Sequence, residues 1–345
     1  MKRNALLLMA VGALVLAAGL LSWPVDSLAQ VVHTEHLNAG TGQPIQGQVT
    51  LQNPVTPIAE EINRFHAWVN KVIIGIAAFV LILLAYVTFK FNERANPQPS
   101  RVTHNAGLEV AWTVIPILIL VTISIPSFRL LFNQYSFPKP DLTIKAYGNA
   151  WFWEHEYPDE KIKITSSMIT DEDVAKAKFG DADYNKRYAG LAGIARFKAL
   201  YADTDPVWRG LEKAPARFGD GRLVRQLSVD NEIAIPVGKV VHLLITSNDV
   251  IHSWTIPSFG SKMQAVPGRV TATWFRADKI GVYYGQCSVL CGKDHSSMPI
   301  AVRVVSDQNY AAWVAAVKAR DLNKARSVLQ QATAGTEAKT FAAAD

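Results

Sequence analysis

The pattern of apolar and polar positions divides the chain of 345 residues into an apolar first part and a mixed second part. Two runs, at 72–89 and 110–128, contain no charged residue, and each is long enough to cross about 30 Å of hydrocarbon as a helix. Two buried helices of a water-soluble protein would give the same pattern. Because a polar stretch joins the two runs, the pattern favours a two-helix transmembrane hairpin over residues 61–135.

From about residue 140 the pattern changes to short β-favouring segments separated by turn residues, which is typical of a Greek-key β-sandwich. We expect this domain at 140–320. A charged, helix-favouring stretch at 171–221 interrupts the strands and is interpreted as a surface insertion. The pattern is helical from Asp307, and residues 321–345 are expected to form a flexible tail. The expected strands are 142–147, 151–157, 223–229, 240–246, 270–275 and 300–305.

Residues 1–29 have the features of a secretory signal peptide. A basic start precedes an apolar stretch at 5–21, and small residues lead to a cleavage site after Ala29. An uncleaved transmembrane helix is the alternative. Cleavage would leave an irregular leader at 30–60 outside the cytoplasm. The charges beside the hairpin do not set its orientation, but the signal peptide does: the loop at 90–108 would be cytoplasmic and the C-terminal domain periplasmic, in a bacterial inner membrane.

The charge distribution argues against a nucleic-acid partner. The net charge is +6, but the 35 Lys and Arg residues are interleaved with 29 Asp and Glu residues. No basic block with interleaved aromatic residues occurs, and such a block is the usual mark of nucleic-acid binding.

One short loop holds both cysteines of the chain, in the sequence GQCSVLCGKDHSSMP. Cys287 and Cys291 are followed closely by His295 and Met298, and thiolate, imidazole and thioether together favour copper. A mononuclear site needs one Cys, two His and an axial Met, with His252 as the distant imidazole. The second cysteine thiolate therefore exceeds what a single copper ion needs. Since two thiolates can bridge two metal ions, the ligand count predicts a binuclear, electron-transferring copper centre.

Three other interpretations of this loop stay open. Two cysteines in an exported domain often form a disulfide. Zinc is less favoured because a thioether is not among its usual ligands. A copper chaperone of thioredoxin type also carries two cysteines at this spacing, but there the His lies far downstream, whereas His295 follows at once.

The copper loop, the segment IHSW and the aromatic run Trp151, Phe152 and Trp153 resemble subunit II of a haem–copper cytochrome c oxidase of bacterial aa3 type. The resemblance extends from about Ile58 to about Trp313 and includes the motifs GVYYGQCS, VPGR and HSSMP. It implies an α+β membrane protein in which a two-helix transmembrane hairpin precedes a cupredoxin-like Greek-key β-sandwich.

The resemblance also implies a function. The family's subunit II accepts electrons from cytochrome c at a binuclear copper A centre and passes them to haem in subunit I, where oxygen is reduced with coupled proton translocation. The implied partners are subunit I, the other oxidase subunits, cytochrome c and membrane lipid.

The resemblance assigns roles to individual residues. The backbone carbonyl of Val289 would be an axial copper ligand, and Trp151 would receive electrons, although packing is the alternative for this tryptophan. The family usually has Glu at position 289, where its side chain reaches a magnesium ion shared with subunit I. Valine offers no oxygen donor, so that magnesium is doubtful here. The implied cytochrome c docking acids are Glu156, Asp230 and Asp249.

Glu109 has two interpretations. A carboxylate at a helix N-terminus is stabilised by the helix dipole without any further role. The family instead places this Glu, in EVAWTVIP, at the entrance of a proton pathway into subunit I.

Two rival functions compete with that of a copper-binding subunit. One is a metal-free quinol-oxidase subunit II of the same fold, and the complete ligand set argues against it. The other is a copper-delivery or thiol-redox protein, which would need a labile pair of thiols and no axial methionine.

Overall fold

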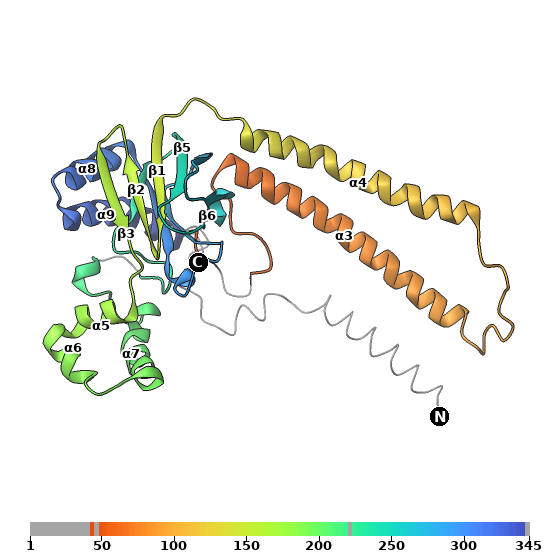
Figure 1. The fold of residues 1–345 in the computed structure, drawn as a ribbon, viewed down its shortest axis with the longest axis horizontal. Coiled ribbons are helices and arrows are strands. Elements are labelled where there is room, and N and C mark those ends of the chain that lie inside the picture. Colours follow the sequence, from red (N-terminus) through yellow and green to blue (C-terminus); the bar gives the residue numbers. More distant parts are fainter. Residues whose placement is uncertain (1–41, 45–47, 220–222, 342–345) are drawn as a thin grey trace.

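A computed structural model describes residues 42–44, 48–219 and 223–341, with side chains as far as Thr333 (Figure 1). The expected signal peptide at 1–29 and residues 30–41 and 45–47 of the expected leader lie outside the described residues.

Two long helices form the hairpin. Helix α3 spans Pro57–Lys90 and helix α4 spans Ala106–Tyr135, and the two lie side by side and extend away from the rest of the chain (Figure 1). The side chain of Thr56 accepts a hydrogen bond from the Ala59 amide and Pro57 takes the first helical turn, so α3 begins a turn earlier than the expected residue 61. Large apolar side chains are exposed along both helices, among them Ile82 at 66% and Leu120 at 65%. Such a surface is stable in lipid and not in water.

Ten strands make up the domain that follows, within the described residues. One sheet has the order β3-β2-β1-β5-β8, a second has the order β4-β10-β9, and β6 and β7 form a separate hairpin. Neighbours are antiparallel except for β1 with β5 and β4 with β10, which are parallel and join strands far apart in the chain. The strands are β1 Leu142–Asn149, β2 Phe152–Tyr157, β3 Ile162–Ser166, β4 Ile233–Pro236, β5 Val240–Ser247, β6 His252–Ile256, β7 Ser261–Ala265, β8 Thr271–Arg276, β9 Gly281–Gln286 and β10 Pro299–Val305.

The core of this sandwich lies between the two sheets. Alternate residues of β1 and β5, such as Ile144 and Leu243, are buried against Ile235 of β4 and Val302 of β10. This alternation is the two-residue period of a strand with one buried face. All seven residues of β10 are buried, because helices cover the other face of its sheet.

The sequence predicted five of these strands within two residues, but the strand expected at 223–229 is wrong. That segment turns back on itself, since the amides of Leu227 and Ser228 both donate to the carbonyl of Val224, and Gln226 has a positive φ. Only an isolated bridge from Val229 to Met168 remains.

The charged stretch between β3 and β4 forms helices α5 (Asp171–Phe179), α6 (Asp181–Arg187) and α7 (Gly193–Trp208) and a short 3₁₀ turn, η1 (Ala216–Phe218). Thr170 and Asp173 cap α5 reciprocally. These helices pack on one another through small apolar clusters of their own and lie at one end of the sandwich (Figure 1).

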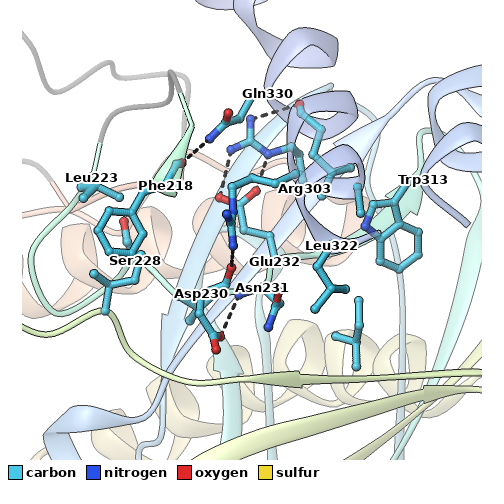
Figure 2. Close-up of a pocket in the computed structure, with 16 residues that line it drawn as sticks. Phe218, Leu223, Ser228, Asp230, Asn231, Glu232, Arg303, Trp313, Leu322 and Gln330 are labelled. Atoms are coloured by element: carbon cyan, nitrogen blue, oxygen red, sulfur yellow. Dashed lines mark hydrogen bonds and ion pairs between the residues drawn. The ribbon is translucent and has the colours of Figure 1, made fainter. Parts of the chain in front are cut away.

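The expectation of a flexible tail from residue 321 does not hold for the described part of that segment. Helices α8 (Asp307–Lys318) and α9 (Leu322–Phe341) pack on the sandwich on the side away from the hairpin (Figure 1). Ala325 and Leu329 are buried, and the buried guanidinium of Arg303 on β10 donates to Glu232 (Figure 2). The same guanidinium also donates to Thr333 on α9. The Ala-rich composition suggested fraying, but regularly spaced apolar residues anchor the helix.

Candidate metal centre

The loop that carries both cysteines connects two neighbouring antiparallel strands. β9 ends at Gln286 and β10 begins at Pro299, and these two residues are paired across the sheet. The amide of Cys287 donates to the carbonyl of Met298 (3.3 Å), which closes the loop at its base. His252 begins β6 and is fully buried, so it approaches the loop from a separate strand.

The structure brings together every side chain that the sequence proposed as a copper ligand. The sulfur atoms of Cys287 and Cys291 lie 3.8 Å apart, and each lies near the Nδ1 atom of one histidine. The distance is 3.9 Å from Cys287 to His252 and 3.4 Å from Cys291 to His295. The thioether sulfur of Met298 lies 3.5 Å from Cys291 Sγ.

The backbone carbonyl of Val289 also faces this cluster. Its oxygen lies 3.3 Å from Cys287 Sγ. The cluster therefore combines two thiols, two imidazoles, a thioether and a carbonyl oxygen, with each thiol beside one imidazole. Both cysteines are free, which argues against the disulfide, and the thioether that turns into the cluster argues against zinc.

The acid–base properties of the two thiols favour a bound cation. Burial raises the pKa of Cys287, but hydrogen bonds from His252, from backbone groups and from Cys291 outweigh it and lower that pKa to about 6. Burial and the nearby charge of Cys287 raise the pKa of Cys291 to about 12. The first thiolate therefore forms readily, while the second is opposed by like charge. Positive charge between the sulfurs removes that repulsion, so the donor set fits the copper pair that the sequence predicts.

Neighbouring residues hold the ligands in place. The carboxylate of Asp249 lies 2.8 Å from Nε2 of His252 and also accepts the Ala150 amide (2.6 Å). This contact leaves Nδ1 of His252 facing the thiols and fixes the orientation of the ring. A side chain at Gly148 would lie 2.7 Å from the His252 ring, so this position requires glycine.

Two tryptophans at the start of β2, Trp151 just before the strand and Trp153 within it, contact the loop directly. Trp151 Nε1 donates to the carbonyl of Cys291 (3.2 Å), and Trp153 Nε1 donates to the carbonyl of Met298 (3.3 Å). Trp153 is fully buried, whereas Trp151 is partly exposed and packs against Gly292. Lys293 lies 5.4 Å from the centroid of the Trp151 ring. Trp151 thus connects the surface with the backbone of a proposed ligand.

The three acids expected to dock cytochrome c have different surroundings. Glu156 accepts a hydrogen bond from Tyr147 (2.8 Å), which lowers its pKa. Asp230 is more enclosed: burial raises its pKa, and its carboxylate accepts the Ser167 and Asn231 amides. Asp249 is exposed over a third of its side chain while it holds His252. Their role in docking stays a prediction.

Glu109 lies in the first turn of α4, where its carboxylate accepts the amide of the N-cap residue Asn105 (3.3 Å). This contact agrees with the interpretation of Glu109 as a carboxylate that stabilises the N-terminus of the helix. The proton-pathway interpretation stays a prediction.

Matches to known proteins cover most of the chain. Residues 44–130 match the transmembrane domain of cytochrome c oxidase subunit II, and residues 142–189 and 213–305 match the periplasmic domain of the same subunit. The chain belongs to the cytochrome c oxidase subunit II family. It is therefore an inner-membrane protein with a periplasmic C-terminal domain, and the sandwich is cupredoxin-like.

Individual relatives agree with this assignment. The chain is 39% identical over 273 residues to cytochrome c oxidase subunit 2 of Cereibacter sphaeroides, with 79% of this chain and 81% of the relative covered. It is 41% identical to a probable cytochrome c oxidase subunit 2 of Rickettsia bellii, with 79% and 85% covered. The crystal structure of the periplasmic domain of subunit II of cytochrome oxidase of Bradyrhizobium japonicum is 37% identical, covers 54% of this chain and 99% of that chain, and has a TM-score of 0.37.

The magnesium ion that the subunit II family implies fits this chain poorly. Val289 offers no side-chain oxygen, and the oxygen donors beside it are the hydroxyls of Ser288, Ser253 and Thr255. These hydroxyls bond one another at 2.8–3.2 Å and carry no charge, whereas magnesium in proteins is usually held by carboxylates.

Sequence reasoning missed the residues that support the ligands. Asp249 was considered only for docking, although a carboxylate three residues before a ligand histidine is a common orienting partner. The hydrogen bond from Trp153 to the Met298 carbonyl has no sequence signal. Gly148 could not be singled out either, because its role depends on the approach of β6.

Proposed function

We propose that this chain is the electron-input subunit of a terminal respiratory oxidase, which accepts electrons from cytochrome c at a binuclear copper centre and passes them to haem in subunit I. The observation that supports it most directly is the convergence of two thiols, two imidazoles, a thioether and a carbonyl oxygen in one loop cluster. Cys287, Cys291, His252, His295, Met298 and Val289 would hold the two copper ions.

A copper pair supplies one-electron transfer when it is bound. The contribution of the chain is to hold the ligands rigidly. The Cys287 amide closes the base of the loop, Asp249 orients His252, and Trp153 fixes the Met298 carbonyl. Because these contacts are all made by protein groups, they restrict the movement of the ligands, and little rearrangement should accompany electron transfer.

The surface beside the loop favours a partner. Leu290 is 79% exposed, and Val250 and Ile251 on the neighbouring loop are exposed by more than 40%. Exposed apolar residues grouped beside a site are typical of contact surfaces. We propose that subunit I or cytochrome c covers this group, with Trp151 as the residue that receives electrons and Glu156, Asp230 and Asp249 as acids that attract a basic donor.

Copper analysis of the full-length chain tests the proposal. We expect two copper ions per chain and a seven-line EPR pattern, and we expect Cys287→Ser to abolish this pattern. Met298→Leu should retain copper but change the spectrum, because the thioether is a weak axial ligand, while Met168→Leu, outside the site, should change nothing. One copper per chain with a four-line spectrum would contradict the binuclear assignment.

The same experiment separates the rival functions. A metal-free quinol-oxidase subunit would bind no stoichiometric copper. A copper-delivery or thiol-redox protein would lose its copper readily to a chelator, and Met298→Leu would leave its spectrum unchanged.

A further inference from the structure

A second site lies where the hairpin meets the sandwich, away from the copper ligands. A cavity of about 70 Å³ is enclosed there by the first turn of α3, the last turn of α4, the 3₁₀ turn η2 (Pro257–Phe259), β7 and β8. Its lining residues are Ile58, Gln134, Tyr135, Phe259, Gly260, Ser261, Lys262, Met263, Ala272, Thr273 and Trp274.

Two polar groups in this lining have no hydrogen-bond partner among the described residues. They are the hydroxyl of Ser261, a residue only 6% exposed, and the indole N–H of Trp274. A buried polar group without a partner is costly and uncommon in folded proteins. Two such groups in one cavity indicate that something polar binds between them.

The chemistry of the lining favours an anion. The Trp274 N–H can only donate, Ser261, Tyr135 and Gln134 can also donate, and the exposed Lys262 adds a positive charge at the edge of this lining. The lining contains no carboxylate, and Lys262 has no acidic partner among the residues described.

The cavity is held open by a rigid junction. The Val55 amide donates to the Ser258 carbonyl (3.0 Å), and the Thr56 hydroxyl donates to the Phe259 carbonyl (2.8 Å). A side chain at Gly260 would come within 3.0 Å of the Cα atom of Ala59, so helix and turn are in close contact there. The cavity is therefore a fixed feature of the junction.

Its position defines the source of the anion. Both helices cross the inner membrane, and the cavity lies at their periplasmic ends, at the depth of the lipid headgroups. Trp274 is also the residue type that membrane interfaces favour. The volume of the cavity is roughly that of two water molecules. A phosphate group can fill a cavity of this size.

We propose that this cavity binds a phosphate oxyanion through Ser261, Lys262 and Trp274, and that the phosphate belongs to a phospholipid of the periplasmic leaflet. This site is independent of the copper ligands and would fix the depth and tilt of the periplasmic domain on the membrane.

The indole N–H of Trp274 can report on binding directly. The full-length chain, labelled with ¹⁵N-tryptophan and delipidated in maltoside, is titrated with dihexanoylphosphatidylglycerol, dihexanoylglycerol and inorganic phosphate. The Trp274 resonance is the one absent from Trp274→Phe. We expect the phospholipid to move it downfield and dihexanoylglycerol, which lacks phosphate, to leave it unchanged. Lys262→Gln should weaken the phospholipid effect about tenfold, and the exposed control Lys279→Gln should not.

The three ligands distinguish the sources of the anion. A response to inorganic phosphate at higher concentration than to phospholipid supports an oxyanion site that lipid fills more tightly. A response to dihexanoylglycerol equal to that of the phospholipid would overturn the proposal, because the phosphate would then contribute nothing. If the Trp274 resonance does not shift with any of the three ligands and shifts only when subunit I is added, the cavity contacts protein and the proposal fails.

Discussion

His155 on β2 provides a quantitative test of how this core is built. Its side chain is 1% exposed, and its Nε2 atom accepts a hydrogen bond from the indole of Trp254 (3.2 Å). Burial lowers the pKa of His155 from its ordinary value of 6.5 to about 3. The folded chain therefore holds a neutral histidine at pH values where an unfolded chain would bind a proton.

The sign and size of the effect follow from this difference. Because the folded pKa is the lower one, the stability that neutral His155 permits is present above pH 6.5 and is lost progressively as the pH falls toward 3. Between pH 7 and pH 5 this single group should reduce the free energy of unfolding by about 2 kcal/mol.

Chemical unfolding of the copper-free chain in detergent, followed by near-UV circular dichroism at the two pH values, measures this loss. His155→Gln keeps an acceptor for Trp254 but cannot titrate, so it should lose about 2 kcal/mol less than the parent chain over the same interval. Trp254→Phe removes the indole donor and leaves the burial, so it should keep the pH dependence. Equal losses in the parent chain and His155→Gln would refute the reasoning.

Three other variants test the copper site and its surroundings. Trp151→Phe should slow reduction by cytochrome c in stopped-flow experiments while copper content stays the same, and an unchanged rate would mean that Trp151 only packs. Asp249→Asn should weaken copper binding by about 10–100-fold in competition with a chelator, because His252 loses its orienting carboxylate. Val289→Glu should raise the magnesium or manganese retained by the purified oxidase after chelator treatment, with little change in the copper spectrum. Equal retention in both forms would show that subunit I and water suffice.

The sequence predicted the parts of the fold that depend on local periodicity. The two charge-free runs became α3 and α4, and the strands with regular alternation, such as β1 and β5, were found within two residues. The strands missed entirely were β3, β4, β6, β7 and β9. β6 and β7 form a hairpin around η2, and β9 is buried along most of its length, so neither shows clear alternation of polar and apolar positions. The packing of α9 also uses a distant contact, from Arg303 on β10 to Thr333 on α9, which no local pattern contains.

The same limit applies to the metal centre. Four of the proposed side-chain ligands lie within twelve residues of sequence, where spacing alone groups them, and His252 was found through a motif. The supporting contacts come from three other segments: Gly148 near the end of β1, the tryptophans at the start of β2, and Asp249 after β5. These segments meet only because β1 and β5 pair in parallel and end at the same edge of the sheet. Sequence spacing can propose a ligand set, but the contacts that orient it depend on sheet topology.

At Val289, the backbone oxygen that faces the thiols is independent of the side chain that the loop carries on its outer surface. The carbonyl oxygen of Val289 faces the thiols, 3.3 Å from Cys287 Sγ, and the backbone supplies that oxygen whatever the side chain is. The neighbouring side chain of Leu290 is exposed to solvent. Substitutions on this outer surface therefore leave the inner donors in place, because the loop closure at Cys287 and Met298 fixes them. A valine at this position is compatible with the proposed copper centre, because the backbone supplies the oxygen that faces the thiols. It is incompatible with a carboxylate-bound magnesium, because its side chain has no oxygen atom.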